Sequence, residues 1–491
     1  MTASDSASTS EPVSPLKNDA LVTEKSVRLS RTAPRCSPSD YETDDMLRHM
    51  TKTTRWLGRT IPLKWQHKFR DGGGFRWLAD SMVTSLAIPL GAITCPSAAK
   101  DFLDVSKNIR HLNYGDHESQ FIEVFLPVGY NENFDRTARS TTYPVRGMVF
   151  FCHGGAWGSG KPWYYRLAAK PFLEVGLAVA IVGYRVYPLC GSPGKQNGDR
   201  GGSRTQIDDL DAALRTLARE YPEWCDKNFE DRLVDRSPRG HSDTHIANHI
   251  PHLGTIVVAH SSGAHISMLW MVENLQKSIT KRQNHSPTNN RTNDIATLEI
   301  TIDAFVGVSG VYNIGHHFDY EAGRGVEEIS PLKPANGYDR QSFAEHSPPW
   351  KVQHELIRKL NEMKHRDLLG LSGSPDVSIP SFPNRMLLLH GAEDDVVPFP
   401  TTSDAAKLLK QCLGAGSSSN DGDRDMTIDE CYIPNTGHQD AVVDLMMLRG
   451  RKGPVTSTML DWLINGNRQL HLHQHYLRQQ SKVRLTRRSK L

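Results

Sequence analysis

A serine stands at the centre of the short segment Ala-His-Ser-Ser-Gly, residues 259–263, between a strand-like and a helix-like stretch. This segment approximates the pattern G-x-S-x-G, in which a tight turn exposes a serine at the end of a strand. Ser261 occupies the central position, and Ala259 replaces the first glycine with another small residue. Such a serine attacks a carbonyl carbon when a nearby base accepts its proton. A five-residue match is weakly specific, so the prediction depends on further residues.

A glycine-rich segment supplies the second feature. His-Gly-Gly-Ala-Trp, residues 153–157, directly follows the apolar run Gly147–Cys152. Glycines let backbone N–H groups approach the oxyanion that forms during acyl transfer. We expect the N–H groups of Gly155 and Ala156 in this role, with that of Ser262 as a third donor.

The same segment also matches a phosphate-binding loop. Residues 155–161 fit G-x-x-x-x-G-K, yet Pro162 stands where that loop needs a serine or threonine. Proline also lacks a backbone N–H for a phosphate oxygen. The sequence therefore predicts no nucleotide site here.

An acid and a base follow later in the chain. Residues 390–398, His-Gly-Ala-Glu-Asp-Asp-Val-Val-Pro, follow the apolar run Arg385–Leu389, and we predict Asp394 as the acid, with Glu393 and Asp395 as alternatives. His438 follows an expected strand around residues 431–433 and is the predicted base among 22 histidines. The order Ser, Asp, His along the chain is the order found in α/β-hydrolases. His265, four residues after Ser261, is expected to pack or to line the pocket.

The surrounding sequence alternates buried strands with helices. Apolar runs predict strands at 121–126, 147–152, 177–183, 255–259, 304–308 and 385–389. Helical spacing of apolar residues predicts helices over 205–221, 263–275 and 455–464. This alternation predicts an α/β fold with a mostly parallel central sheet and helices on both faces.

Composition divides the chain into expected segments. Residues 1–45 are rich in Ser, Thr and Pro and are expected to be disordered. A helical segment over 46–108, a candidate lid, precedes a hydrolase domain over 109–465, and a basic tail covers 466–491. Polar stretches within the domain are expected to be surface insertions, at 226–252, 277–297 and 414–425.

The charge balance, the hydropathy and the cysteine content argue against several classes of protein. A net charge of +3 over 491 residues indicates no nucleic-acid partner. The longest stretch without charged residues or histidine, 81–99, contains two prolines, so we expect no transmembrane helix, and the N-terminus lacks the pattern of a secretory signal. Seven cysteines without a C-x-x-C pair indicate free thiols and no zinc site. No metal or other cofactor is expected.

Together these residues resemble the esterase/lipase branch of the α/β-hydrolase superfamily, and more closely the prenylcysteine methylesterase-like proteins. The resemblance runs from about residue 108 to residue 463. Further motifs carry it: Tyr114–Asp116, Tyr184-Arg185, Gln206–Asp209, Gly307–Asn313, His346–Pro348 and Gly437–Asp440. It implies a serine esterase acting on a small-molecule or lipidated ester. Plant members of the group carry apolar N-terminal spans, which this chain lacks.

Two alternatives to this function stay open. The related kynurenine formamidases carry a similar H-G-G-x-W loop, which makes an arylformamidase the first alternative. A non-catalytic binding protein with a hydrolase fold is the second. Trp157 and Trp163 are candidates for an apolar substrate pocket, and the alternative is that they are ordinary core aromatics.

The C-terminal tripeptide Ser489-Lys490-Leu491 matches the signal read by the peroxisomal import receptor. It predicts a peroxisomal location, with the cytosol or the cytosolic face of endomembranes as the alternative. The basic residues before it also allow contact with a membrane surface.

Overall fold

The structure is a computed structural model of the chain, and it describes nine stretches of residues. These are residues 96–127, 145–193, 201–226, 252–284, 300–327, 329–358, 382–413, 426–447 and 453–466. Several predicted segments lie outside the described residues: the N-terminal tail, most of the candidate lid, most of the three insertions, and the basic tail with Ser489–Leu491. The predicted domain boundaries stay predictions.

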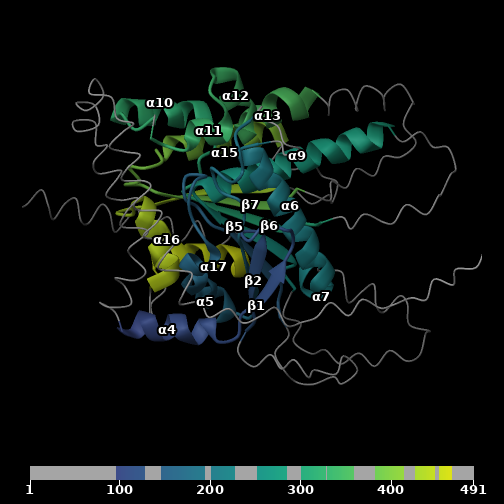
Figure 1. Cartoon of the computed structure of the whole chain (residues 1–491), viewed down its shortest axis with the longest axis vertical. Helices are drawn as coiled ribbons and strands as arrows, with labels where there is room; N and C mark the ends of the chain where they lie inside the picture. Colours follow the sequence, from purple (N-terminus) through teal and green to yellow (C-terminus); the bar gives the residue numbers. More distant parts are fainter. Residues whose placement is uncertain are drawn as a thin grey trace, which may run out of the picture. The chain divides into compact units, whose positions relative to one another are not determined.

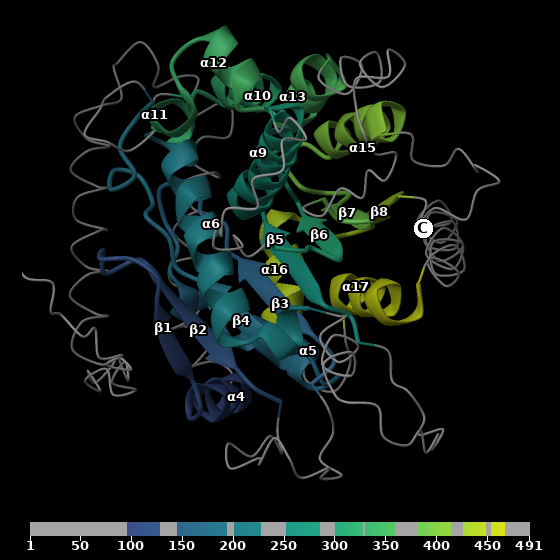
Figure 2. The same cartoon turned by 90° about the vertical axis from the view of Figure 1, so that its right-hand side faces the viewer.

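Eight strands form one sheet (Figure 1), in the order β1-β2-β4-β3-β5-β6-β7-β8 (Figure 2). The strands β1 and β2 are antiparallel to their neighbours, and the pairs from β4 to β8 are parallel. Their bounds are Arg110–Asn113, Phe121–Phe125, Met148–Cys152, Ala178–Val182, Thr255–His260, Ala304–Val308, Arg385–Gly391 and Thr427–Ile433, for β1 to β8. The predicted fold class, an α/β-hydrolase fold with a mostly parallel sheet, is confirmed.

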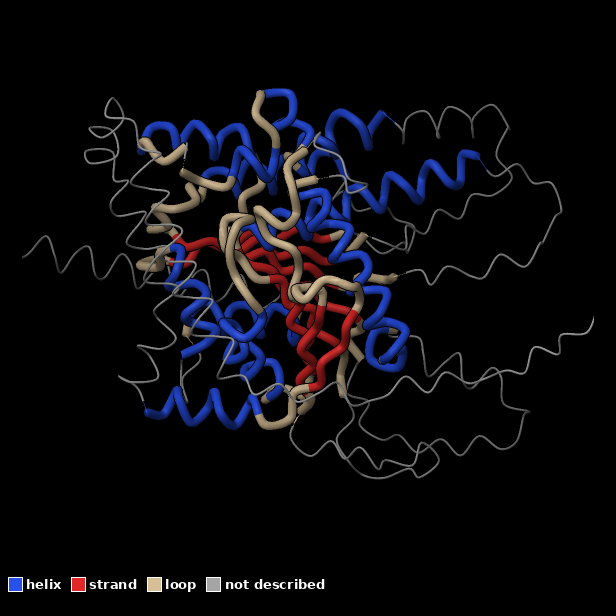
Figure 3. The backbone as a smooth tube through the Cα atoms, viewed as in Figure 1, coloured by secondary structure: helices blue, strands red, loops and turns tan. Residues whose placement is uncertain are grey.

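Helices cover both faces of this sheet (Figures 2 and 3). Alternate residues of each strand point to opposite faces, so β3 buries Phe150 in one core and Val149 and Phe151 in the other. One core includes residues of α6 (Ser203–Glu220), α9 (Ser262–Asn284) and α15 (Pro400–Leu413). The opposite core includes residues of the 3₁₀ helix η2 (Pro162–Ala169), α5 (Lys170–Leu173), α16 (His438–Met447) and α17 (Pro454–Asn465).

Short helices connect β6 to β7 and lie together in both views (Figures 1 and 2). They are α10 (Ile314–Arg324), α11 (Leu332–Asn336), α12 (Arg340–Glu345), α13 (Pro348–Lys351) and the π-helical turn η3 (Val352–Leu356). The remaining helices are α4 (Pro96–Ser106) and α7 (Pro222–Cys225). Helix α9 is longer than predicted, since it runs to Asn284 and makes residues 277–284 of the expected insertion helical.

The register of the parallel strands brings their carboxyl ends to one edge. Cys152 of β3 pairs with Ala259 of β5, and His260 pairs with Val308 of β6. On the next strands, Val308 pairs with Leu389 of β7, and Gly391 pairs with Ile433 of β8. The loops that begin at residues 153, 261, 392 and 434 therefore start beside one another, which is where ligands bind in open α/β sheets.

A buried ion pair joins β2 to helix η2. Arg166 Nε and Nη2 donate to the two carboxylate oxygens of Glu123 at 2.8 and 2.6 Å, and both side chains are buried. We expect Arg166→Met to lower the free energy of unfolding by about 3–5 kcal/mol, because it leaves the Glu123 carboxylate buried without its cation. Chemical denaturation followed by circular dichroism measures this loss.

Two further variants test the cause of that loss. The double variant Arg166→Met/Glu123→Leu should recover most of the stability, since it removes the unpaired charge. The exposed helical pair Arg215–Asp211 provides the control, and Arg215→Met is expected to cost about 0.5 kcal/mol or less. Equal losses for Arg166→Met and Arg215→Met would contradict the prediction.

Candidate active site

Ser261 lies in a strained turn between β5 and α9. Its φ of +54° is in the left-handed region, which non-glycine residues rarely adopt. Its backbone N–H donates to Val308 O at 2.9 Å, and its carbonyl accepts from His265 N at 3.2 Å. A side chain at Gly263 would place Cβ 2.2 Å from His153 O, so the start of α9 can approach β3 only with glycine there.

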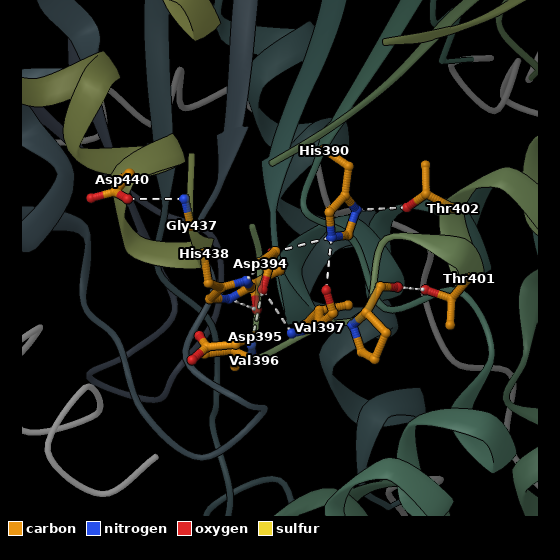
Figure 4. A network of polar contacts seen from close by, with 12 residues as sticks. His390, Asp394, Asp395, Val396, Val397, Thr401, Thr402, Gly437, His438 and Asp440 are labelled. Atoms are coloured by element: carbon orange, nitrogen blue, oxygen red, sulfur yellow. Dashed lines mark hydrogen bonds and ion pairs between the residues drawn. The ribbon is translucent and has the colours of Figure 1, made fainter. Parts of the chain in front are cut away.

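Ser261, His438 and Asp394 form one chain of hydrogen bonds. Ser261 Oγ lies 2.9 Å from His438 Nε2. His438 Nδ1 lies 2.8 Å from Asp394 Oδ2 (Figure 4). An ionised carboxylate only accepts hydrogen bonds, so Nδ1 carries the proton and Nε2 is free to accept the serine proton. The structure thus brings together three residues that are 177 and 44 positions apart.

His438 is the first residue of α16, and local contacts fix this helix start. The N–H of Gly437 donates to Asp440 Oδ2 at 2.9 Å, as in a capping box where the third helical residue reaches back (Figure 4). The imidazole itself is buried, with 5% of the residue exposed. The base is therefore held by a helix terminus, which is more rigid than a free loop.

The three adjacent acids have different surroundings. Asp394 Oδ1 accepts from the N–H groups of Val396 and Val397 at 3.0 and 2.8 Å. Glu393 is exposed, and Asp395 is half-buried with its carbonyl accepting from Tyr320 of α10. Of the three, Asp394 is the acid that contacts His438.

The charge state of Asp394 follows from competing effects. Burial alone would raise the pKa of its carboxyl group, but the charge of His438 and hydrogen bonds from His390 and His438 outweigh burial. The pKa of Asp394 therefore lies well below its usual value, and the side chain is ionised at neutral pH.

The glycine-rich loop lies directly against Ser261. A Cβ at Gly154 would sit 2.8 Å from Ser261 Cβ, so any side chain there would collide with the serine. Gly155, Ala156 and Trp157 have φ values of +132°, +49° and +61°, which turn the loop back on itself. Within the described part of the chain, the N–H groups of Gly155 and Ala156 have no hydrogen-bond acceptor.

Ser262, the third predicted donor, is the first residue of α9. The N–H groups of a helix's first turn have no acceptor within the helix, and the helix dipole places partial positive charge there. The three predicted N–H donors therefore belong to two segments next to Ser261: the glycine-rich loop packed against it and the start of α9 directly after it.

The two tryptophans have different places. Trp157 is buried, with 1% exposed, and its indole N–H donates to His265 Nδ1 at 3.0 Å. Its carbonyl accepts from Gln206 Nε2 at 2.9 Å, so the residue anchors the glycine-rich loop on α6 and α9. Trp163, in η2, is half-buried and contacts Tyr164 edge-on. A pocket-lining role for either stays a prediction.

Two histidines without a predicted role contact the site. His390 Nε2 lies 3.1 Å from Asp394 Oδ2, and the His260 ring lies 4.9 Å from the His438 ring. Their positions at the ends of β7 and β5 were the available signal, because residues there meet at the carboxyl edge.

Four buried histidines are expected to lower the free energy of unfolding in acid. Burial lowers the pKa of His260 and His265 to about 3, and of His153 and His346 to about 4. In the unfolded chain a histidine has a pKa of about 6.5, so below that pH the unfolded state binds more protons than the folded state. We expect the free energy of unfolding to fall as the pH drops from about 6.5 to about 4, with up to about four protons taken up.

Urea denaturation at neutral pH and at two acidic pH values measures this dependence. In the variant His346→Gln the free energy of unfolding should fall less steeply as the pH drops. The slope should correspond to about one proton fewer, because the unfolded chain then has one histidine fewer to protonate. A denaturation midpoint that stays constant from neutral pH to about pH 5 would contradict the prediction.

The described residues show neither a metal-binding cluster nor a membrane-spanning helix. The described residues contain no group of three His, Cys, Asp or Glu side chains placed to hold a metal ion. In the same part of the chain, no helix combines the length and the apolar composition needed to cross a bilayer. The five cysteines described there have free thiols, Cys152, Cys190, Cys225, Cys412 and Cys431.

No protein-family model matches the chain, and no curated protein matches it either. Solved structures similar to it include esterase B from Lactobacillus rhamnosis, at 15% identity and a TM-score of 0.44, covering 79% of this chain and 95% of that one. Carboxyl esterase 2 from Tuber melanosporum matches at 13% identity and a TM-score of 0.40, covering 72% and 85%. Esterase 2 from Thermogutta terrifontis matches at 13% identity and a TM-score of 0.39, covering 73% of this chain and 95% of that one. The strand order of its own sheet and the helices on both faces of that sheet give the chain an α/β-hydrolase fold.

Proposed function

We propose that this protein is a serine hydrolase that cleaves a carboxylic ester through an acyl-enzyme intermediate. The observation that carries the proposal is the chain of hydrogen bonds from Ser261 through His438 to Asp394. The left-handed turn at Ser261 supports it, because such backbone strain persists where the surrounding structure enforces it and is concentrated at functional sites.

The first half of the reaction forms the acyl-enzyme. Ser261 Oγ attacks the ester carbonyl carbon while His438 Nε2 accepts the hydroxyl proton. Asp394 keeps the imidazole in the required tautomer and stabilises its positive charge. His438 then returns the proton to the oxygen of the leaving alcohol as the carbon–oxygen bond breaks.

The second half releases the acid. Water attacks the acyl carbon and gives a proton to His438, which passes it to Ser261 Oγ as the carboxylic acid departs. In both halves the carbonyl oxygen becomes negatively charged. The N–H groups of Gly155, Ala156 and Ser262 would donate to this oxygen, and the loss of one such donor typically lowers the rate about 10²–10³-fold.

We propose a lipidated ester as the substrate class, with the methyl ester of a prenylated cysteine as the specific candidate. The support is the resemblance carried by the motifs at Gln206–Asp209, Gly307–Asn313 and Gly437–Asp440. In the fold Asp209 accepts a hydrogen bond from Arg185 after β4, Asn313 caps α10, and Gly437 precedes the predicted base.

A substrate panel tests this proposal. Purified protein is assayed with p-nitrophenyl esters of increasing acyl length, a prenylcysteine methyl ester and N-formylkynurenine, each in parallel with Ser261→Ala. A kcat/KM highest for the prenylcysteine ester supports the specific substrate, and one highest for formylkynurenine replaces it with the formamidase alternative. Absence of fluorophosphonate labelling in folded protein would favour a non-catalytic role.

A further inference from the structure

Asp394 contacts two imidazole rings through a single oxygen atom. Oδ2 lies 2.8 Å from His438 Nδ1 and 3.1 Å from His390 Nε2 (Figure 4). The other oxygen is occupied separately by the N–H groups of Val396 and Val397. The mechanism above uses only His438, so His390 has no role in it.

The contacts of His390 define its tautomer. Nε2 lies 2.9 Å from Val397 O as well as near Asp394 Oδ2, and both of these oxygens only accept hydrogen bonds. Nε2 therefore carries the proton, which it donates to Val397 O while the N–H group lies beside Asp394 Oδ2. Nδ1 accepts from the Thr402 hydroxyl of α15 at 2.7 Å. Since His390 and Thr402 are both fully buried, the ring has one fixed orientation toward Asp394.

The N–H group of His390 lowers the negative charge that Asp394 presents to His438. A hydrogen bond to a carboxylate stabilises its charged form and draws charge toward the donor. Part of the negative charge on Oδ2 is therefore shared with His390 instead of being directed to His438 alone. The low pKa of Asp394 agrees with this sharing, because the hydrogen bond from His390 is one of the effects that outweigh burial.

The other ionisable groups around His438 are few in the described structure. His260 faces it from β5, and Asp394 and His390 face it from the β7 end. From α10, Tyr320 and Arg324 donate to the carbonyl of Asp395, next to the acid. Of these groups, only His390 shares the oxygen that His438 uses.

We infer that His390 is a positioning residue of this site: its Nε2–H group, 3.1 Å from Asp394 Oδ2, holds the carboxylate and sets the pH range in which Ser261 reacts. The inference rests on the proposed function. Without the His390 N–H group beside Oδ2, His438 is the one imidazole in contact with that oxygen, and the full carboxylate charge favours the protonated, inactive form of His438. The acid limb of the pH–rate profile should then move to higher pH by about 0.5–1 unit.

Four variants separate this role from a structural one. His390→Phe and His390→Leu fill the space without a donor, and each should move the acid limb upward. His390→Gln retains an N–H that can donate, so its acid limb should lie closer to that of the wild type. Thr402→Val removes the anchor of the ring but leaves the donor, so it should lower stability and leave the acid limb in place.

The readouts are kcat/KM and the rate of fluorophosphonate labelling of Ser261, from about pH 5 to about pH 9. Labelling does not depend on knowing the substrate. No labelling of the wild type at any pH would overturn the proposed function and this inference with it. Labelling with an acid limb that moves by less than about 0.2 unit in both donor-free variants would overturn the inference alone. If His390→Leu does not fold, His390→Phe, which retains a ring, decides the result.

Discussion

Replacing Ser261 with alanine is expected to lower kcat for ester hydrolysis by about 10⁴–10⁶-fold. The variant removes the only oxygen that His438 Nε2 contacts among the described residues, and with it the covalent intermediate. KM should change little, because the acyl and alcohol groups of the ester would bind elsewhere in the site. Steady-state kinetics with a p-nitrophenyl ester and loss of fluorophosphonate labelling measure the effect.

The neighbouring serine provides the control for this result. Ser262 is buried, and its hydroxyl has no hydrogen-bond partner in the described structure, while its backbone N–H is the proposed oxyanion donor. Ser262→Ala keeps that N–H, so kcat should fall by less than about tenfold, against the roughly 10²–10³-fold effect of losing a donor. If Ser261→Ala kept more than about a tenth of wild-type kcat, Ser261 would not be the nucleophile.

The second large effect is expected from Asp394→Asn, which should lower kcat by about 10⁴-fold. Asparagine has nearly the same shape, but its amide carries no charge to stabilise the imidazolium. Its NH₂ group can also donate to His438 Nδ1, which favours the tautomer with the proton on Nε2. In that tautomer the imidazole cannot accept the proton of Ser261.

The adjacent acids are the matched controls for Asp394. Asp395→Asn and Glu393→Gln remove one charge each from the same turn, but the Asp395 side chain is half-buried and that of Glu393 is exposed. We expect each to change kcat by less than about tenfold, since charges near solvent interact weakly with the site. A larger loss for Asp395→Asn than for Asp394→Asn would reassign the orienting acid.

The parts of the fold that follow from local sequence were predicted with close bounds. Residues 178–182, Ala-Val-Ala-Ile-Val, form the buried strand β4, and the apolar stripe of residues 203–220 lies on α6. Strand β1, Arg-His-Leu-Asn, was missed because four mostly polar residues carry no strand period. Its pairing with β2 defines it, and that pairing is a contact between segments.

The candidate site likewise has features that the sequence predicts and contacts that only the fold creates. The sequence by itself determined which residue types stand at the ends of the strands: a serine between small residues, a glycine-rich turn, a run of three acids and a histidine after a glycine. Only the tertiary structure decided that Asp394, and neither of its neighbours, contacts His438, and that His390 shares its carboxylate. The strand and helix predictions depend on the spacing of apolar residues within a few positions of the chain. Which side chains meet depends on strand register and on the packing of distant segments, and no local pattern records either.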